Sequence, residues 1–475
     1  MKEIQKLFPW KIIMIILVTA FSGCIKNNIP DQPHAAESFI KLGNGIIVVK
    51  DVWSKKLSLP GGVQKKNESL EETARRKTLE ETGILVTVGK ELMRTPDYVL
   101  FQCEPVNIVS AIKMQFPKGK LFYRIPHLNA SRNEIERILL INPMLSKEKD
   151  FRFPSQLKII QKLFAEEEKI SSNLLILEKP LRCMNKIEYL GTRIISGFQK
   201  FDAKIIKIFS HIFSSLGSQF IFLAVPYFLL CTPGKQGKEL LFLILVSSLI
   251  NFILKGTFGL PRPFEILPSI QLSKGIGFGF PSGHAQLATV FWGYFFWRAR
   301  SDWIKLILIT IILLVGLSRI YLGVHYPHDV VGGWFFGAII VSVYYILASR
   351  KAVHSFSIGQ SFSWGIFVCV AFLSIRLWFH PVTVGIIALW YGVLCGIVFS
   401  GKRIYSKPLS FGFGQKVIRT LIGILGMIFI LVIFHFITPE DKKFFTMFVI
   451  QVLKYFCLGL WLCWGSFVIV DTLKK

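Results

Sequence analysis

Three polar clusters stand among long apolar runs between residues 255 and 329. The first extends from Lys255 to Pro263 (KGTFGLPRP), the second is the tetrapeptide 281–284 (PSGH), and the third extends from Ser318 to Asp329. Ionisable groups at membrane depth are costly and are therefore functional candidates by default. The set supplies cations that can neutralise negative charge, imidazoles that can transfer protons or act as nucleophiles, and a carboxylate that can orient an imidazole. Such a set suits a tetrahedral oxyanion.

The spacing of the clusters predicts that they meet at one site. Apolar runs place the first two clusters at one side of a membrane, and two further crossings return the third cluster to that side. His325 and Asp329 are four residues apart, so on a helix they would share one face. The side chain of Arg319 could point into the same site. The glycine-rich segment 275–279, which precedes the second cluster, would let its backbone come close to a bound anion.

These clusters resemble the signature of the type 2 phosphatidic acid phosphatase superfamily, which shares its fold with vanadium haloperoxidases. The signature reads K-x6-R-P, then P-S-G-H, then S-R-x5-H-x3-D, and the resemblance extends over about residues 185–350. It implies that His325 is a nucleophile forming a phosphohistidine, that His284 protonates the leaving oxygen, and that Asp329 orients His325. It implies no metal. The groups that it assigns to the phosphoryl oxygens are Lys255, Arg262, Ser282, the backbone N–H of Gly283, and Arg319.

Composition indicates a soluble part joined to a membrane bundle. Of the 475 residues, 52% are hydrophobic, and the mean hydropathy is +0.51, which is high for a soluble protein. A net charge of +27 would indicate nucleic acid as the partner of a soluble protein. In a membrane protein, lysine and arginine gather in cytoplasmic loops and at interfaces. We therefore predict no nucleic-acid partner.

Residues 1–24 are typical of an export signal. A basic start precedes a short apolar run, and the stretch ending at Cys24 (AFSGC) is similar to a bacterial lipoprotein cleavage site, whose cysteine would carry lipid. The alternative is an uncleaved anchor. Both place the following chain outside the cytoplasm, beginning with a polar tether at 25–35.

Residues 36–165 are predicted to form a soluble α/β domain. Strands are expected over 46–50 and 56–59, then a glycine turn, then a helix over 68–81 that ends at Gly83. The segment resembles the Nudix hydrolases, whose fold is an α/β sandwich and whose box is G-x5-E-x7-R-E-U-x-E-E-x-G-U, with U aliphatic. The matching residues are Gly62, Glu68, Arg76, Glu80, Glu81, Gly83 and Ile84.

The box departs from the family pattern at its centre. In the family, carboxylates at helix positions i, i+3 and i+4 hold Mg²⁺ on one face. Here Lys77 stands in place of the first carboxylate, and Thr78 in place of an aliphatic residue. We expect Lys77 to pair with Glu80 or Glu81 instead of a metal, which leaves Mg²⁺ binding by this domain open.

About nine membrane spans are expected in the rest of the chain. The preceding residues 166–210 contain a basic amphipathic stretch that would lie in the headgroup plane, or pack as a linker helix on the α/β domain. We assign 211–350 to the phosphatase-like core and 351–475 to additional spans. The expected spans cover residues 212–231, 239–255, 284–299, 303–322, 329–347, 361–379, 382–400, 417–437 and 447–470.

Charge in the loops predicts the orientation. Lysine and arginine gather opposite the three polar clusters, so the positive-inside rule places the clusters outside the cytoplasm. An odd number of spans places the α/β domain on the same side, in agreement with the export signal.

The sequence thus predicts a multi-pass lipid phosphatase or diphosphatase of the bacterial inner membrane, acting at its outer face. The lipid and the oligomeric state stay open. Three alternatives remain: a haloperoxidase that holds vanadate in the same cradle, a Mg²⁺-dependent Nudix pyrophosphohydrolase anchored by the spans, and a non-enzymatic lipid-binding protein.

Overall fold

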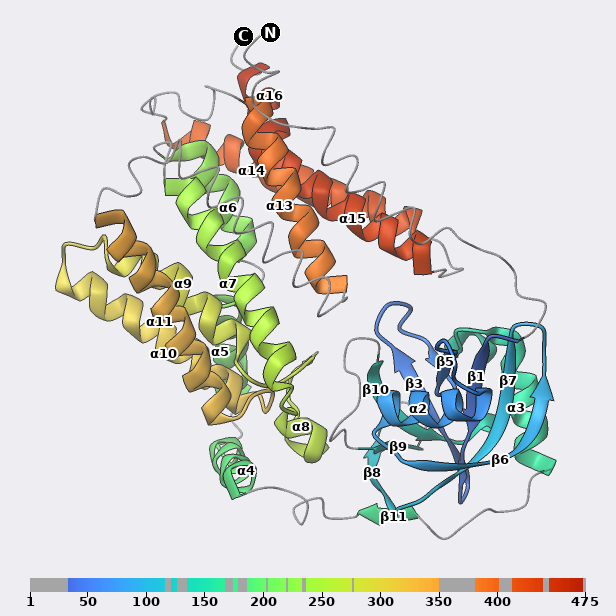
Figure 1. Cartoon of the computed structure of the whole chain (residues 1–475). Helices are drawn as coiled ribbons and strands as arrows, with labels where there is room; N and C mark the ends of the chain where they lie inside the picture. The colour runs from blue at the N-terminus through green and yellow to red at the C-terminus, as the bar shows by residue number, and fades with distance from the viewer. Residues whose placement is uncertain are drawn as a thin grey trace.

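The chain folds into an α/β domain followed by a bundle of helices (Figure 1). The computed structural model describes residues 33–115, 121–125, 135–166, 174–177, 186–201, 204–218, 221–232, 236–275, 277–349, 381–400, 412–438 and 444–472. The predicted combination of an α/β domain with a helical bundle is confirmed. The predicted export signal and Cys24 lie outside the described residues.

Two sheets form the α/β domain. The first has the strand order β5-β1-β7-β6, and the second has the order β11-β8-β9-β10-β3-β2, with β4 paired to β3. Strand β11 pairs with β8, so the second sheet receives a strand from beyond residue 165. The bounds are β1 Ala35–Phe39, β2 Lys41–Leu42, β3 Gly45–Asp51, β4 Leu57–Ser58, β5 Gly61–Val63, β6 Val86–Arg94, β7 Tyr98–Pro105, β8 Val109–Gln115, β9 Leu121–Ile125, β10 Ile135–Ile141 and β11 Leu174–Leu177.

Two helices cover opposite faces of the first sheet. Helix α2 (Leu70–Thr82) carries the predicted Nudix box, and α3 (Pro154–Glu166) lies across the sheet from it. Successive strand residues point to opposite faces. In β1, accordingly, Ser38 accepts a hydrogen bond from the Thr78 hydroxyl of α2, at 2.7 Å, while the Glu37 carboxylate accepts one from the Gln156 amide of α3, at 3.1 Å.

Helix α2 has well-defined ends. The Ser69 hydroxyl accepts a hydrogen bond from the Glu72 N–H, and the Glu72 carboxylate accepts one from the Ser69 N–H; together these form a capping box. Gly83 ends the helix in the left-handed conformation, at φ 70°. The helix therefore begins at Leu70, slightly later than predicted, because Ser69 and not Glu68 caps it.

The bundle contains helices long and apolar enough to cross a membrane. Among the described residues there are five such segments: Gln236–Ile266, Asp302–Tyr321, Pro327–Leu347, Phe413–Ile437 and Thr446–Val470. They support a multi-pass membrane protein. The bounds of the helices are α6 Ile221–Cys231, α7 Gln236–Phe258, α8 Pro263–Ile266, α9 Gly283–Phe296, α10 Asp302–Tyr321, α11 Pro327–Ser349, α13 Pro381–Ser400, α14 Phe413–Ile437, α15 Phe444–Leu460 and α16 Ser466–Thr472.

The predicted number of about nine spans is not confirmed. Helices α6 and α9 have 11 and 14 residues, whereas a helix needs about 20 to cross the hydrocarbon core. The span expected at 361–379 lies outside the described residues.

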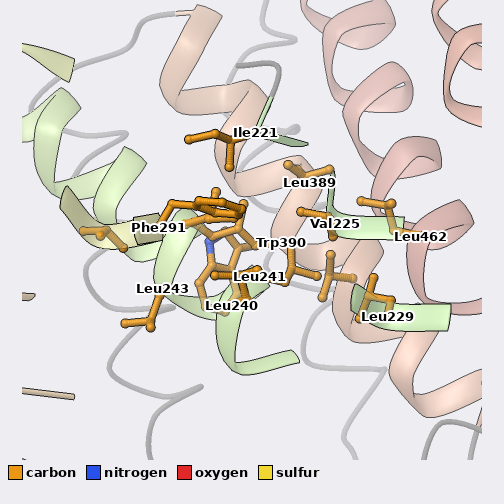
Figure 2. Packing of buried hydrophobic residues seen from close by; sticks show 14 of the residues in the cluster. Ile221, Val225, Leu229, Leu240, Leu241, Leu243, Phe291, Leu389, Trp390 and Leu462 are labelled. Atoms are coloured by element: carbon orange, nitrogen blue, oxygen red, sulfur yellow. The ribbon is translucent and has the colours of Figure 1, made fainter. Parts of the chain in front are cut away.

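A buried apolar cluster joins the first helices of the bundle to the C-terminal ones. Figure 2 shows Trp390 of α13 among Leu240 and Leu241 of α7, Phe291 of α9 and Leu462. The Trp390 ring meets the Phe242 ring of α7 edge to face, with 5.6 Å between their centroids. Aromatic burial of this kind contributes area and fixed geometry, so α13 is held firmly against α7.

The amphipathic stretch before the bundle forms two helices, α4 (Lys186–Gln199) and α5 (Lys204–Ser215). The Gln199 amide donates to the backbone oxygens of Ile270 and Tyr321, at 2.8 and 2.7 Å. These contacts place α4 on the bundle, and not on the α/β domain as the linker alternative required. Several large apolar side chains of the two helices are exposed: Ile187, Leu190, Ile194, Phe198, Ile205, Ile208, Phe209 and Ile212.

Candidate active site

The three polar clusters meet at one end of the bundle (Figure 1). Lys255 lies in the last turn of α7, and Arg262 directly precedes α8. Residues 281–284 form the start of α9. Arg319 lies in the last turn of α10, and the loop that follows brings His325 and Asp329 to the start of α11. The side chains of Arg262, Ser282, Arg319, His325 and Asp329 are all buried.

His325 is held between a carboxylate and a guanidinium. Its Nδ1 lies 3.3 Å from the Asp329 Oδ2, and its Nε2 lies 3.1 Å from the Arg262 Nη1. A guanidinium can only donate, so Nε2 must accept. In a neutral imidazole the proton is then on Nδ1, which faces Asp329. The lone pair of Nε2, the atom that would attack, is therefore directed at a cation.

Asp329 is fixed by backbone as well. Its Oδ2 accepts a hydrogen bond from the Tyr326 N–H at 2.9 Å, and its carbonyl accepts one from the Ser282 N–H at 2.8 Å. His325 precedes α11, and Asp329 lies in its first turn. The predicted pairing is thus made across the helix start, and not on one face of a continuous helix.

Two cationic side chains, Lys255 and Arg262, donate hydrogen bonds to the glycine-rich segment 275–279. The Lys255 ammonium donates to the carbonyls of Phe278 and Gly279, at 2.6 and 3.2 Å. Arg262 donates through Nε to the Gly277 carbonyl, at 2.7 Å. A Cβ on Gly279 would come within 2.8 Å of the Pro261 carbonyl and 3.0 Å of the Asp329 Oδ2. Glycine is needed here for this close backbone approach.

Two buried donors at the site lack a hydrogen-bond partner within the part of the chain that the structure describes. They are the Ser282 hydroxyl and the Arg319 Nε. Leaving a buried polar group unsatisfied costs roughly 1–3 kcal/mol, so their placement fits an anion that would satisfy them. The Gly283 N–H belongs to the first turn of α9, where backbone N–H groups have no intrahelical acceptor. These three donors fit the phosphoryl-binding role that the sequence predicts.

His284 follows in the same turn of α9. It lies within electrostatic reach of Lys255, Arg262 and Arg319, and of His325. The structure therefore brings all eight predicted residues of the phosphatase-like site to one place.

A series of hydrogen-bonded polar side chains beneath the 281–284 turn was not predicted from the sequence. The Asn251 amide of α7 donates to the Gln286 Oε1 of α9 at 2.9 Å and to the Pro281 carbonyl at 3.4 Å. The Gln286 amide in turn donates to the Ser247 carbonyl at 2.9 Å. A Cβ on Gly283 would lie 3.0 Å from the Asn251 Oδ1. Asn251 thereby positions the turn that carries Ser282, and the unusual amide within an apolar run could have revealed it.

We expect Asn251→Ala to weaken oxyanion binding without abolishing turnover. Losing hydrogen bonds of this kind costs about 0.5–1.5 kcal/mol each, so inhibition by orthovanadate should weaken by roughly three- to tenfold. The measurement is the inhibition constant of orthovanadate against phosphate release. Ser248→Ala is the matched control, since the Ser248 hydroxyl donates to the Ile244 carbonyl one turn away in the same helix; an equal effect of both variants would contradict a positioning role for Asn251.

His328 is closer to the site than its lack of a motif position suggested. Its Nε2 lies 3.3 Å from the Asp329 Oδ1. Its ring stacks on Tyr326, with 5.3 Å between centroids. It is therefore a direct neighbour of the Asp329 carboxylate.

The predicted Nudix box forms a network of ion pairs. Arg76 lies 2.6 Å from Glu68 and 3.1 Å from Glu80, and the Lys77 ammonium lies 3.5 Å from Glu80. The hydrogen bond from Arg76 lowers the pKa of Glu68 to about 2. Burial raises the pKa of Glu80, but Arg76 and Lys77 outweigh it and hold that pKa below its usual range. Lys77 thus pairs with Glu80, as predicted.

The remaining carboxylate of the box is also engaged. Glu81 is buried, and its Oε2 accepts a hydrogen bond from the Gly61 N–H at 3.1 Å. A Cβ on Gly62 would lie 2.8 Å from the Lys77 Cε, so the lysine stem fills the space beside the glycine turn. Within the described ranges, no group of three or more His, Cys, Asp or Glu residues could hold a metal ion. A donor set with a lysine at its centre does not fit Mg²⁺, which prefers oxygen ligands.

Known families match the chain in three segments. Residues 236–352 match the PAP2 superfamily. Residues 384–473 match the transmembrane extension of PAP2 superfamily phosphatases, and residues 35–111 match the NUDIX domain. Both resemblances predicted from the motifs are thereby confirmed.

The curated relatives are named phosphatases. The probable sphingosine-1-phosphate phosphatase of Dictyostelium discoideum is 28% identical over 40% of this chain and 50% of its own length. Phosphatidylglycerophosphatase B of Bacillus subtilis is 33% identical over 22% and 54%. Glucose-6-phosphatase 3 of Mus musculus is 29% identical over 26% and 41%. The chain thus spans about half the length of the curated relatives it matches.

Proposed function

We propose that this protein is a membrane-embedded phosphatase that hydrolyses a lipid phosphate or diphosphate through a phosphohistidine at His325. The observation that carries the proposal is the placement of His325 between Asp329 and Arg262. That arrangement leaves an unprotonated Nε2 facing the cations, as a nucleophile for phosphorus requires.

The reaction has two displacements. The His325 Nε2 attacks phosphorus, the bond from phosphorus to the leaving oxygen breaks, and His284 gives that oxygen a proton. Water then attacks the phosphohistidine, His284 takes a proton from this water, and inorganic phosphate leaves with His325 restored. Asp329 accepts a hydrogen bond from the Nδ1–H of His325 throughout and stabilises positive charge on the ring.

Electrostatic stabilisation would supply most of the acceleration. The phosphoryl oxygens gain charge density in the transition state, and preorganised donors in a buried site act on it strongly. Arg262 and Arg319 are already buried and held by backbone or side-chain contacts, so little reorganisation is needed. The Ser282 hydroxyl and the Gly283 N–H complete the cradle.

A lipid substrate is supported by the surroundings of the site. Phe258 and Leu260, between Lys255 and Arg262 in the chain, are exposed, as is one face of α4. The names of two of the three relatives above include a lipid phosphate. An exposed apolar rim beside a buried cationic site suits a phosphate carried on an apolar tail.

We further propose that the site and the α/β domain face the outside of a bacterial inner membrane. The positive-inside rule and the export-signal pattern of residues 1–24 support this orientation. The divisions at 211–350 and 351–475 stand as proposed domain boundaries, with Cys24 as the proposed lipidation site. The α/β domain, predicted to cover 36–165, extends to β11 (Leu174–Leu177), which pairs with β8.

We expect phosphate release to be unchanged by EDTA, because the cradle consists of cations, a hydroxyl and backbone N–H groups. The measurement is phosphate release in detergent from a panel of lipid phosphates and diphosphates, each with and without EDTA, by the wild type and by His325→Ala. Release that stops with EDTA and persists in His325→Ala would move the chemistry to the Nudix-like domain. Halide oxidation with added vanadate would instead favour the haloperoxidase, and no phosphate release from any substrate would favour a lipid-binding protein.

A further inference from the structure

One turn of the α/β domain packs against the C-terminal helices. Val52 and Trp53, between β3 and β4, are buried with Val384 of α13 in one apolar cluster, against which Phe448 and Val452 of α15 pack. The ring centroids of Trp53 and Phe448 are 6.2 Å apart. Trp53 is only 9% exposed, although it lies at the tip of a turn, where side chains are usually solvated.

The turn itself is fixed in shape. The Asp51 carboxylate accepts a hydrogen bond from the Ser54 N–H at 2.5 Å, and the Asp51 carbonyl accepts one from the Lys55 N–H at 3.1 Å. Lys55 adopts the left-handed conformation, with φ 60°, which is uncommon for a residue other than glycine. The backbone thus presents Val52 and Trp53 outward in a single arrangement.

The surface that receives the turn is rigid as well. Helices α13 and α15 approach backbone to backbone at Gly392 and Gly459, where a Cβ would overlap the carbonyls of Phe456 and Leu389 respectively. Small residues allow this close packing in membranes. The Gln451 amide of α15 also donates to the Pro381 carbonyl at the start of α13, at 3.2 Å.

This pair of helices is connected to the catalytic bundle. Trp390 packs α13 onto α7 (Figure 2), and α7 carries Lys255 in its last turn. Figure 1 shows the α/β domain beside the end of the bundle that carries α8, which is the end of the candidate site.

We propose that the C-terminal extension, residues 381–472, is the docking platform for the α/β domain of the same chain, with Val52 and Trp53 as the anchor. An aromatic side chain buried in an apolar socket is the usual energetic centre of an interface. The extension then holds the Nudix-like domain at the end of the bundle where the phosphatase-like site opens. This assignment does not depend on the phosphatase activity.

Hydrogen exchange of the full-length protein in detergent tests the docking. Phe448→Ala should speed exchange in residues 45–58 by about thirtyfold, equivalent to ~2 kcal/mol, a typical loss for an interface anchor. In the opposite direction, Trp53→Ala should speed exchange in residues 444–456. Phe436→Ala is the control, because Phe436 is 82% exposed on α14 and its loss should leave both segments unchanged.

The same experiment separates docking from insertion of Trp53 into lipid. If Trp53 served only as a membrane anchor, Phe448→Ala would leave residues 45–58 unchanged, and the proposal would be overturned. Unchanged exchange in α9 (residues 283–296) shows that a variant's bundle has kept its fold. If exchange in α9 changes in Phe448→Ala, Val384→Ala is used instead, and it should likewise speed exchange in residues 45–58.

Discussion

Replacing His325 with alanine should reduce phosphate release to the background of the assay. Phosphate monoesters hydrolyse so slowly in water that enzymatic accelerations reach ~10²¹. In the proposed mechanism, loss of the Nε2 nucleophile prevents the phosphohistidine from forming, and water would have to attack the substrate directly. The measurement is release of radiolabelled phosphate from the lipid on which the wild type is active, by the wild type and by the variant.

His328 provides the matched control for this prediction. It is a histidine from the same loop, and it contacts the second oxygen of Asp329, but it does not face the cations as His325 does. His328→Asn should keep activity within about tenfold, since it removes a neighbour of the orienting carboxylate and leaves the nucleophile in place. If His325→Ala kept measurable turnover while His328→Asn lost it, the assignment of the nucleophile would be wrong.

Trapping the intermediate adds an independent readout. Denaturing the wild type during turnover of a phosphate-labelled lipid should leave acid-labile label on the protein, as a phosphohistidine does, and His325→Ala should carry none. Label on the variant would place the covalent chemistry elsewhere.

The contact of His325 with Asp329 could be predicted from the sequence because it is local. Within S-R-x5-H-x3-D, the short separation of His325 and Asp329 is enough for their contact, which is measured at 3.3 Å. The contact between Arg262 and His325, 63 residues apart, has no such local cause. It arises because α7, α9 and α11 pack side by side; the order of the apolar runs placed the two residues at the same side of the membrane, and the family resemblance placed them in one site.

The residues that were missed belong to no motif. Asn251 and Gln286 act through the packing of α7 against α9, so their effect on Ser282 and Gly283 depends on the three-dimensional arrangement. His328 also matches no motif position, although its contact with Asp329 is between neighbours in the chain. The docking of Trp53 could not be predicted from the sequence. A tryptophan in a turn looks like any exposed aromatic residue until the helices that contact it are known.

Helix ends and span lengths were predicted less well than helix positions. Apolar runs mark where helices lie, but α6 begins only at Ile221, after α5 and the hydrogen-bonded turn at 216–218, and α9 ends at Phe296, before the predicted residue 299. The amphipathic stretch likewise forms two helices, α4 and α5, where its periodicity suggested one. Periodicity reports the face of a helix, and not where the chain bends.

Replacing Arg262 with alanine should lower turnover by roughly 10²–10³, the usual loss when one donor to a developing oxyanion is removed. Arg262 is the cation that touches the His325 Nε2, and it also donates to the carbonyls of Gly277 and Val324. Arg262→Lys should restore little, because a single ammonium cannot reach these three acceptors in the planar geometry of a guanidinium.

The kinetic pattern distinguishes this role from a structural one. An interaction made only in the transition state lowers kcat and kcat/KM equally, whereas an interaction made equally with bound substrate and transition state raises KM alone. Arg298→Ala is the control: Arg298 pairs with Glu239 at 2.7 Å, beyond the far end of α9 from the site. Because it removes a partly exposed ion pair without touching the cradle, any effect should be a small loss of thermal stability, with kcat within about threefold of wild type. Equal losses of kcat in Arg262→Ala and Arg298→Ala would mean that the cations stabilise the bundle, and that the transition state is stabilised by other groups.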